Sequence, residues 1–162
     1  METHTMHKMP GANKMQYQKL LIMVILSFIA MFILMYSMVD KIENVTININ
    51  QFYMAALMTA PMIIIEMALM GSMYMNKKLN LLIMAISSIV LVACFLFIRN
   101  QTGVSDKQFV RSMIPHHAAA LLMAKEADIK DPEIKTLISN IISSQQKEID
   151  FMKDKIKKME NK

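Results

Sequence analysis

Three long runs of apolar residues dominate the N-terminal part of the chain, and each is long enough to cross a bilayer. The runs lie at residues 20–39, 52–75 and 79–98. About 20 residues, each rising roughly 1.5 Å along a helix, span a hydrocarbon core of about 30 Å. Because the backbone in lipid must satisfy its own hydrogen bonds, isolated spans of this length are expected to be helices. The pattern predicts a membrane domain of three helices over residues 20–98.

Beyond a short linker at residues 99–104 the pattern becomes amphipathic. Ser105 and Gln108 form the pattern of a capping box, which predicts a helix from there to about residue 128. Asp131 and Pro132 predict the start of a second helix, which we expect to end near residue 158. Its stripe, at spacings of three and four residues, consists of Ile134, Ile138, Ile141, Gln145, Glu148, Met152, Ile156 and Met159. Residues 105–162 are therefore predicted to form a helical hairpin.

Two amphipathic helices cannot enclose a core of their own, because a lone antiparallel pair leaves part of both apolar stripes in water. We therefore expect the hairpin to be half of a four-helix bundle that a second copy of the chain completes. The predicted fold class is all-α, with three transmembrane helices followed by this amphipathic hairpin. The predicted partners are membrane lipid and a second copy in a homo-oligomer.

The distribution of lysines predicts the orientation in the membrane. The loop between the first two spans carries only Lys41, opposed by two acids, whereas the lysines of the other two polar segments are Lys8, Lys14, Lys19, Lys77 and Lys78. The positive-inside bias then places the tail at residues 1–19 in the cytoplasm and the hairpin outside. In a bacterial plasma or inner membrane, that outer face is the periplasm or the cell exterior.

The amino-acid composition excludes some classes of function and points to others. The chain has a single cysteine, Cys94, so no disulfide within the chain holds the fold together. Its 18 Lys and Arg exceed its 13 Asp and Glu, giving a net charge of +5, but no dense basic run with interleaved aromatics is present. Nucleic acid is therefore not an expected partner. Methionine is unusually frequent, at 20 residues.

Imidazole and thioether side chains cluster on the first helix of the hairpin. At roughly 100° per residue, His116 and Met123 lie about 20° apart around the helix. Met113 and His117 lie about 40° apart on the adjoining part of the same face. The facing stripe of the second helix supplies Gln145, Glu148 and Met152. Imidazole with thioether suits copper, Cu(I) in particular, and Ag(I) is expected to behave alike.

Other chemistries have less support. Calcium and magnesium need several carboxylates, and only Glu148 is placed for such a role. The chain lacks the H-E-x-x-H motif of zinc hydrolases and the paired Glu-x-x-His motifs of di-iron bundles. No arrangement of a nucleophile with a base is evident either. An enzyme is therefore not expected. The alternative to metal binding is a buried polar network, in which histidine bonds to Glu148 or Gln145 and methionine fills the core.

The motifs of the hairpin resemble a known family. The resemblance rests on His116-His117 within M-I-P-H-H-x-x-A-x-x-M and on the Gln-x-x-Glu-Ile-x-x-Met motif at 145–152. Roughly residues 105–155 are similar to the family called domain of unknown function 305. The resemblance implies a ferritin-like helical bundle associated with copper and silver outside the cytoplasm, here in a membrane-anchored form. Many soluble members carry two hairpins, so this single hairpin would need a second chain. The implied ligands are Met113, His116, His117, Met123 and Met152, with Gln145 and Glu148 as ligands or as partners that orient the imidazoles.

A second candidate site lies inside the membrane. Glu66 is the only ionisable group deep in a span, and such groups usually face a bundle interior and mark function. It shares an arc of the second span with Met58, Met62, Met70 and Met73. These residues could form a relay for a soft cation or an interface with a partner helix. Alternatively, the methionines face lipid and a protonated Glu66 bonds to Thr59 or to a neighbouring chain.

Two further groups of methionines are notable. Met35 and Met38 share a face of the first span with Met23 and Met31, and the N-terminal tail holds His4, Met6, His7 and Met9, which can capture metal weakly. The sequence thus favours a membrane-anchored copper- or silver-binding protein for metal tolerance, storage or delivery, working with other metal-handling proteins. The alternative is an interaction or scaffold subunit without metal, whose hairpin mediates oligomerisation.

Overall fold

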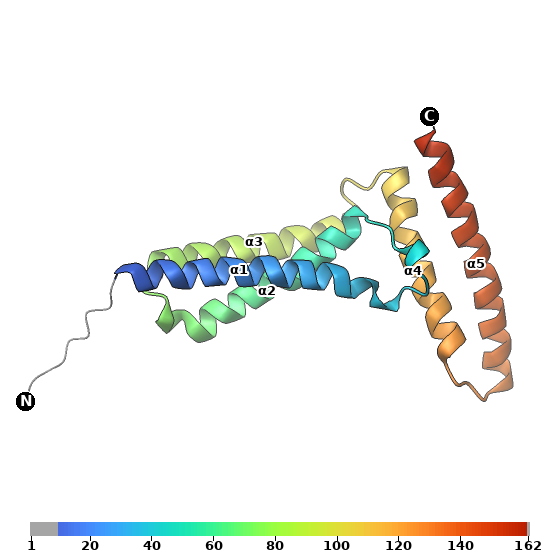
Figure 1. The fold of residues 1–162 in the computed structure, drawn as a ribbon, viewed down its shortest axis with the longest axis horizontal. Helices are drawn as coiled ribbons and strands as arrows, with labels where there is room; N and C mark the ends of the chain where they lie inside the picture. The colour runs from blue at the N-terminus through green and yellow to red at the C-terminus, as the bar shows by residue number, and fades with distance from the viewer. Residues whose placement is uncertain (1–9, 162) are drawn as a thin grey trace, which may run out of the picture. The chain divides into compact units, whose positions relative to one another are not determined.

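The computed structural model describes the backbone of residues 10–161 and the side chains of residues 14–161, and every regular element in this part of the chain is helical (Figure 1). The predicted all-α class is confirmed. The histidines and methionines of the tail lie at residues 4–9, outside the described residues. The helices are α1 (Pro10–Leu34), α2 (Ile49–Met70), α3 (Lys77–Asn100), α4 (Asp106–Glu126) and α5 (Pro132–Glu160), with short 3-10 turns η1 (Met35–Met38), η2 (Ile42–Asn44) and η3 (Gly71–Met73).

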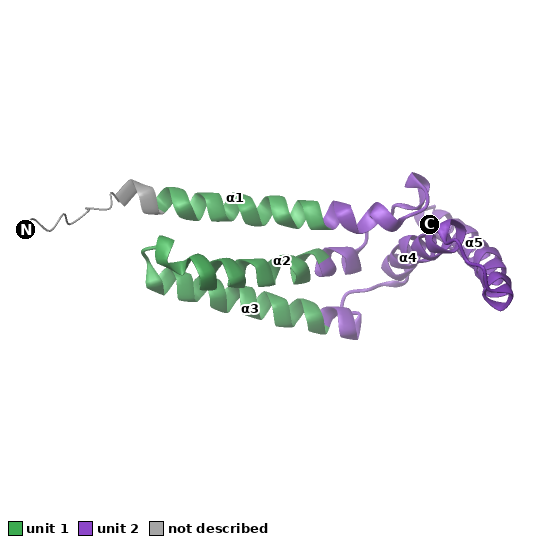
Figure 2. Ribbon diagram, turned by 90° about the horizontal axis from the view of Figure 1, so that it is seen from below, with its two compact units in different colours: residues 1–31, 55–96 green, residues 32–54, 97–162 purple. Residues whose placement is uncertain are grey.

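The chain forms two compact units, which Figure 2 shows in different colours. The first unit comprises residues 1–31 and 55–96, and the second comprises residues 32–54 and 97–162. The second unit therefore contains more than the predicted hairpin. It also includes the C-terminal end of α1, the N-terminal end of α2 and the C-terminal end of α3.

Three segments are long and apolar enough to cross a membrane: Lys14–Met38, Ile49–Met73 and Lys77–Asn100. They match the three predicted spans to within a few residues, except that the first begins earlier. Pro61 lies inside α2 without ending it. Polar groups within these helices bond locally, as where the Thr59 hydroxyl donates to the carbonyl oxygen of Ala55 at 2.8 Å. Such bonding is what a helix surrounded by lipid requires.

The first unit has a small interior and an apolar exterior. Leu20, Met67 and Tyr74 are buried together, while Leu26, Leu69 and Ile89 are 60%, 78% and 68% exposed. In a water-soluble protein such side chains form the core, because exposing apolar surface to water is unfavourable. An outward-facing apolar surface around three long helices is compatible with membrane association.

The hairpin begins at caps that the sequence predicts, with one difference. The Ser105 hydroxyl accepts a hydrogen bond from the Gln108 amide at 3.4 Å. The reciprocal half of the predicted capping box is wrong, because the Gln108 side-chain oxygen instead accepts from the amide of Ile49 at 2.9 Å. At the second helix, the Asp131 carboxylate accepts from the amides of Glu133 and Ile134 at 2.8 and 3.0 Å. Both caps satisfy amides that have no partner within the helix.

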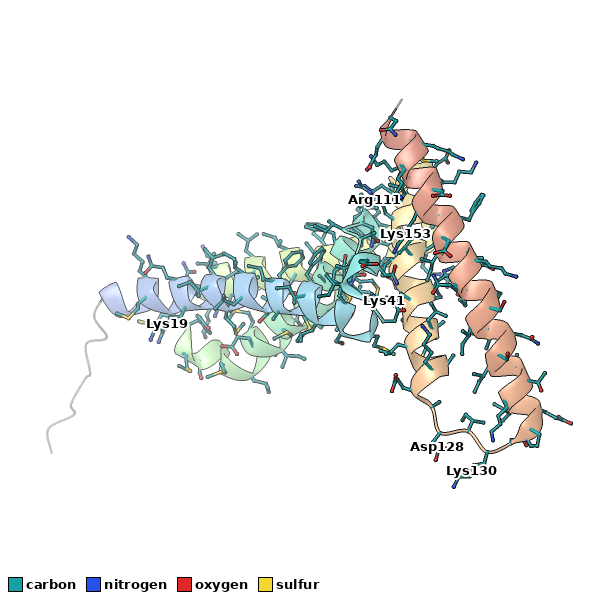
Figure 3. The ribbon with its side chains drawn as sticks, turned by 45° about the vertical axis from the view of Figure 1, so that its right-hand side comes forward. Lys19, Lys41, Arg111, Asp128, Lys130 and Lys153 are labelled. Carbon is teal, nitrogen blue, oxygen red and sulfur yellow. The ribbon has the colours of Figure 1, made fainter. Side chains whose placement is uncertain are left out.

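The core of the second unit lies along the seam between α4 and α5. Its buried members are Ile114, Ala118, Leu121, Ile149 and Met152. Ile149 was not in the stripe that the sequence analysis selected. Figure 3 shows Arg111 on α4, Lys153 on α5, and Asp128 and Lys130 in the turn that joins the two helices. The predicted second copy that would complete a four-helix bundle remains a prediction.

A loop at residues 39–48, here called the bracing loop, fastens α4 to the ends of α1 and α2. Val39 packs against the hairpin core, and the Thr46 hydroxyl donates to the carbonyl oxygen of Arg111. The Asp40 carboxylate lies 3.7 Å from the Lys125 ammonium. With the bond from Ile49 to Gln108, these contacts hold α4 along much of its length.

Candidate functional site

His117 is buried in the seam of the hairpin, and both of its ring nitrogens have partners. Nδ1 lies 2.8 Å from the carbonyl oxygen of Met113, and Nε2 lies 2.7 Å from the Glu148 carboxylate. A carbonyl oxygen can only accept, so Nδ1 donates to Met113, while Nε2 is engaged by Glu148. Neither nitrogen of this ring is free to bind a metal ion.

His116 is in a different environment, although it is the next residue along α4. A step of one residue rotates a side chain by roughly 100° around a helix, which takes His116 out of the seam. Its side chain is exposed, and no described residue forms a hydrogen bond with its ring. The ring centroids of His116 and His117 are 6.0 Å apart, with the planes inclined at 65°. His116 therefore has ring nitrogens available for a ligand.

The structure divides the seven predicted hairpin ligands into separate groups. His117, Glu148 and the buried Met152 lie in the seam, and Met113 and His116 line a cavity beside α4. Met123 is 54% exposed and lines neither. Gln145 is half-buried on α5. The ligands were predicted to lie along one face of the hairpin, whereas the helix places the adjacent histidines in two different surroundings.

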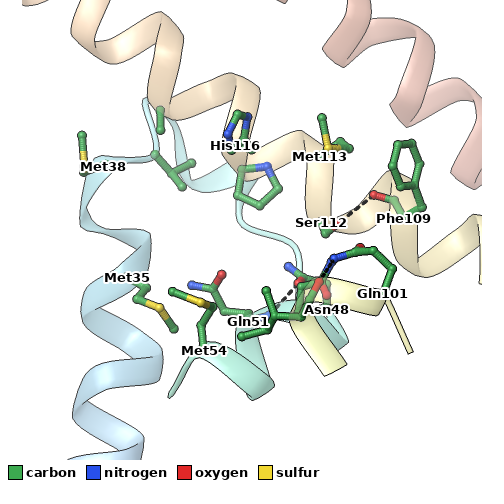
Figure 4. A pocket seen from close by; sticks show the side chains of 15 residues that line it. Met35, Met38, Asn48, Gln51, Met54, Gln101, Phe109, Ser112, Met113 and His116 are labelled. Atoms are coloured by element: carbon green, nitrogen blue, oxygen red, sulfur yellow. Dashed lines mark hydrogen bonds between the residues drawn. The ribbon is translucent and has the colours of Figure 1, made fainter. Parts of the chain in front are cut away.

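The cavity beside α4 has a volume of about 520 Å³ and lies within the second unit (Figure 4). We call it the methionine cavity, because its lining includes Met35 and Met38 of η1, Met54 of α2 and Met113 of α4, together with His116. In the view of Figure 4, His116 lies between Met38 and Met113. The sequence analysis noted that Met35 and Met38 share a face, but it did not connect them with His116. The remaining lining residues are Val39, Asn48, Asn50, Gln51, Ile98, Gln101, Phe109, Ser112, Pro115 and Ala119.

The donor atoms of this cavity are soft and neutral. No Asp, Glu or Cys is among its lining residues. Across the described residues, no group of three or more His, Cys, Asp or Glu side chains is placed to hold a metal ion. Calcium, magnesium and structural zinc need carboxylate or thiolate ligands, so the cavity does not suit them. Thioethers with an imidazole suit Cu(I) and Ag(I).

The predicted intramembrane site has a different arrangement. The Tyr74 hydroxyl donates to the Glu66 carboxylate at 3.1 Å, and Thr59 bonds elsewhere, to Ala55. The methionines of the arc lie mostly at the surface of the unit: Met58, Met70 and Met73 are 40%, 39% and 44% exposed, and Met62 is half-buried.

Comparison with known proteins places the chain in a family. Residues 61–156 match the family described as domain of unknown function (DUF305). The chain belongs to the DUF305 family. The match begins inside α2, so it covers the C-terminal part of α2 and all of α3 in addition to the hairpin on which the sequence resemblance rested.

An uncharacterized protein of Acanthamoeba polyphaga mimivirus is similar to this DUF305 protein along nearly its whole length. The two are 37% identical over 153 residues, which cover 91% of this chain and 99% of the viral protein. No solved structure matches the chain. Because neither the family description nor the viral relative names a ligand, a functional proposal has to rest on the geometry of the site.

Proposed function

We propose that this DUF305 protein is a membrane-anchored binder of Cu(I) or Ag(I) that serves metal tolerance, storage or delivery at the extracytoplasmic face. One observation carries the proposal: the imidazole of His116 has no hydrogen-bond partner among the described residues and lines, with Met113, a cavity without carboxylates. The neighbouring His117 is occupied on both nitrogens. The pair therefore offers one ligand and one structural residue.

The chemistry of the donors favours exchange over permanent storage. A thioether carries no proton to lose and no charge, so it binds a soft cation without the strong attraction of a thiolate. An imidazole beside such thioethers raises affinity while leaving the site free of fixed negative charge. These properties suit a protein that receives an ion and passes it on.

Membrane anchoring is supported by the three long helices with apolar exteriors. Lysines at the N-terminal end of the first segment (Lys8, Lys14 and Lys19) and at the start of α3 (Lys77 and Lys78) favour a cytoplasmic N-terminus. The hairpin then lies on the extracytoplasmic side, where it can meet metal ions from outside or a protein that handles them.

The test is competition binding on the purified full chain in detergent, with Cu(I), Ag(I) and Zn(II) offered under reducing conditions. We expect Cu(I) and Ag(I) to bind more tightly than Zn(II), and His116→Ala to weaken both soft ions at least about tenfold, the effect of losing roughly 1.4 kcal/mol of binding. The matched control is His116→Asn, which keeps a polar side chain but no imidazole and should lose binding equally. Equal affinity of wild type and both variants would overturn the proposal.

A second candidate function has an observation in its favour. Phe109, Leu137 and Phe151 of the hairpin are 52%, 56% and 62% exposed, as expected if the hairpin mediates oligomerisation without metal. In that case Leu137→Ser with Phe151→Ser lowers the oligomer mass measured by light scattering, and His116→Ala changes neither the mass nor metal tolerance of cells. A tolerance defect of His116→Ala at unchanged mass and protein level favours the metal-binding function.

A further inference from the structure

We infer that the soft-cation site is completed by methionines from outside the hairpin, namely Met35, Met38 and Met54, which join Met113 and His116 in the methionine cavity. The inference rests on the proposed function and specifies where the ion is held and by which groups. It assigns the site to the place where the ends of α1 and α2 meet α4, within one compact unit.

The methionines of the cavity converge from distant parts of the chain. Met35 and Met38 belong to η1, Met54 to the beginning of α2, and Met113 to α4, yet all four line one cavity of about 520 Å³ with His116. In the view of Figure 4, Met35 and Met54 lie at the opposite side of the cavity from His116. Methionine has three rotatable bonds beyond its Cα, so these thioethers can converge on an ion without moving the backbone.

Two polar side chains of the cavity wall, Asn48 and Ser112, are engaged by the protein's own hydrogen bonds. Asn48 donates to the carbonyl oxygen of Thr46 at 3.0 Å and accepts from the amide of Gln51 at 2.9 Å. The Ser112 hydroxyl donates to the carbonyl oxygen of Phe109 at 2.8 Å. These bonds engage two polar side chains of the wall, whereas the buried Oδ1 of Asn50 has no hydrogen-bond partner among the described residues. An amide oxygen is a hard donor that suits a soft cation poorly, so the groups best placed to bind Cu(I) or Ag(I) are the thioethers and the imidazole.

The lack of charged side chains in the cavity lining favours a monovalent ion. Moving a cation from water into a cavity is costly unless the protein supplies compensating charge or strong ligands. With no carboxylate in the lining, a divalent ion has nothing to balance its charge, whereas a monovalent ion loses far less hydration. Cu(I) and Ag(I) combine a single charge with a preference for thioethers, so the cavity selects them over Zn(II) and Cu(II).

The experiment compares two triple variants of the full chain in detergent micelles. Met35→Leu/Met38→Leu/Met54→Leu removes three cavity thioethers while nearly conserving volume and apolar character, so folding is retained. The matched control, Met15→Leu/Met23→Leu/Met84→Leu, changes three methionines that do not line the cavity. Circular dichroism checks folding. Competition against a Cu(I) chelator and X-ray absorption at the copper edge then measure affinity and the number of sulfur neighbours.

We expect the cavity variant to lose at least tenfold in Cu(I) and Ag(I) affinity and to show fewer sulfur neighbours, with the control within twofold of wild type. Binding that still depends on His116 but is unchanged in the cavity variant would overturn this inference and leave the proposed function standing. Wild-type chain that binds neither soft ion would overturn both. Equal losses in the two triple variants would also overturn the inference, because the effect would then not belong to the cavity.

Discussion

Nε2 of His117 lies 2.7 Å from the Glu148 carboxylate, and this contact joins α4 to α5 across the seam of the hairpin. The other nitrogen of the ring is held by the carbonyl oxygen of Met113, one turn earlier on α4. His117 is therefore part of the structure that holds the hairpin closed, while His116 lines the cavity. Replacing both histidines together would mix a loss of stability with a loss of binding, so they need to be tested separately.

Breaking the seam contact should destabilise the hairpin. Hydrogen bonds to charged groups contribute about 1.5–3 kcal/mol, and since Glu148 is partly exposed we expect His117→Ala to lower the free energy of unfolding by about 2 kcal/mol. Thermal unfolding followed by circular dichroism in detergent measures the change. Glu148→Gln keeps an acceptor for one nitrogen and should cost less; a larger loss for Glu148→Gln than for His117→Ala would contradict this assignment.

Replacing His116 should leave stability almost unchanged. The side chain is exposed and no described residue hydrogen-bonds to it, so His116→Ala is expected to change the free energy of unfolding by no more than about 0.5 kcal/mol. The same unfolding measurement, run beside His117→Ala, provides the comparison. A loss for His116→Ala as large as that for His117→Ala would mean that both histidines are structural.

Met152 should act as a core residue. It is 8% exposed and packs with Ile114 and Ile149, so Met152→Ala should cost about 2–5 kcal/mol through loss of buried surface and a cavity. Met152→Leu nearly conserves volume and should cost less than about 1.5 kcal/mol. We expect Met152→Leu to retain wild-type affinity for Cu(I); a tenfold loss in this variant would show that the sulfur is a ligand.

The ion pairs of Glu160, at the end of α5, with Lys107 and Arg111, near the start of α4, should weaken at acidic pH. A hydrogen bond from Lys107 at 3.0 Å, together with Arg111 at 2.9 Å, lowers the pKa of Glu160 below its usual value of 4.5. Because this pKa is lower in the folded chain than in the unfolded one, the stabilisation is complete above 4.5 and is lost as pH falls through the folded value. Thermal unfolding at a series of acidic pH values should show a smaller acid-dependent fall in Tm for Glu160→Gln than for wild type. Identical pH profiles would show that the contact adds nothing to stability.

The turn between α3 and α4 should require a glycine. Gly103 has φ 73°, a conformation that costs an L side chain about 1 kcal/mol, and an added Cβ would meet the Tyr53 hydroxyl only at an ordinary 3.5 Å. Gly103→Ala is therefore expected to destabilise the chain by about 1 kcal/mol through the backbone alone. Gly71→Ala is the matched control, since Gly71 lacks positive φ and has nothing within 4 Å of an added Cβ. Unfolding measurements should separate the two variants.

Local features of the fold were the most predictable from the sequence. The caps at Ser105 and Asp131 depend on bonds to amides two or three residues away, so the sequence placed them correctly. The partner of the Gln108 side chain was missed, because it is the amide of Ile49, 59 residues earlier. Ile149 was missed because the selected stripe followed Glu148, which lies at the edge of the seam.

The candidate site was predictable only in part, for the same reason. Spacing placed the two histidines on α4, but the period of a helix does not tell which of two adjacent residues faces a partner. The methionines of η1 and α2 reach the cavity through the tertiary arrangement of the second unit, which no local pattern encodes. A signal that could have found the cavity is the presence of Met35 and Met38 at the end of the first span and of Met54 at the start of the second.

The bracing loop gives the hairpin a second attachment, in addition to the chain connection that follows α3. A domain on one flexible linker sweeps a volume set by the length of that linker. A domain fastened by Val39 and Thr46 as well keeps α4 in a fixed direction relative to the helix ends that surround the cavity. Within the second unit, the hairpin is thus held in one place and does not swing on a single linker. Under the proposed delivery function, a protein that collects the ion has to reach the hairpin by its own diffusion.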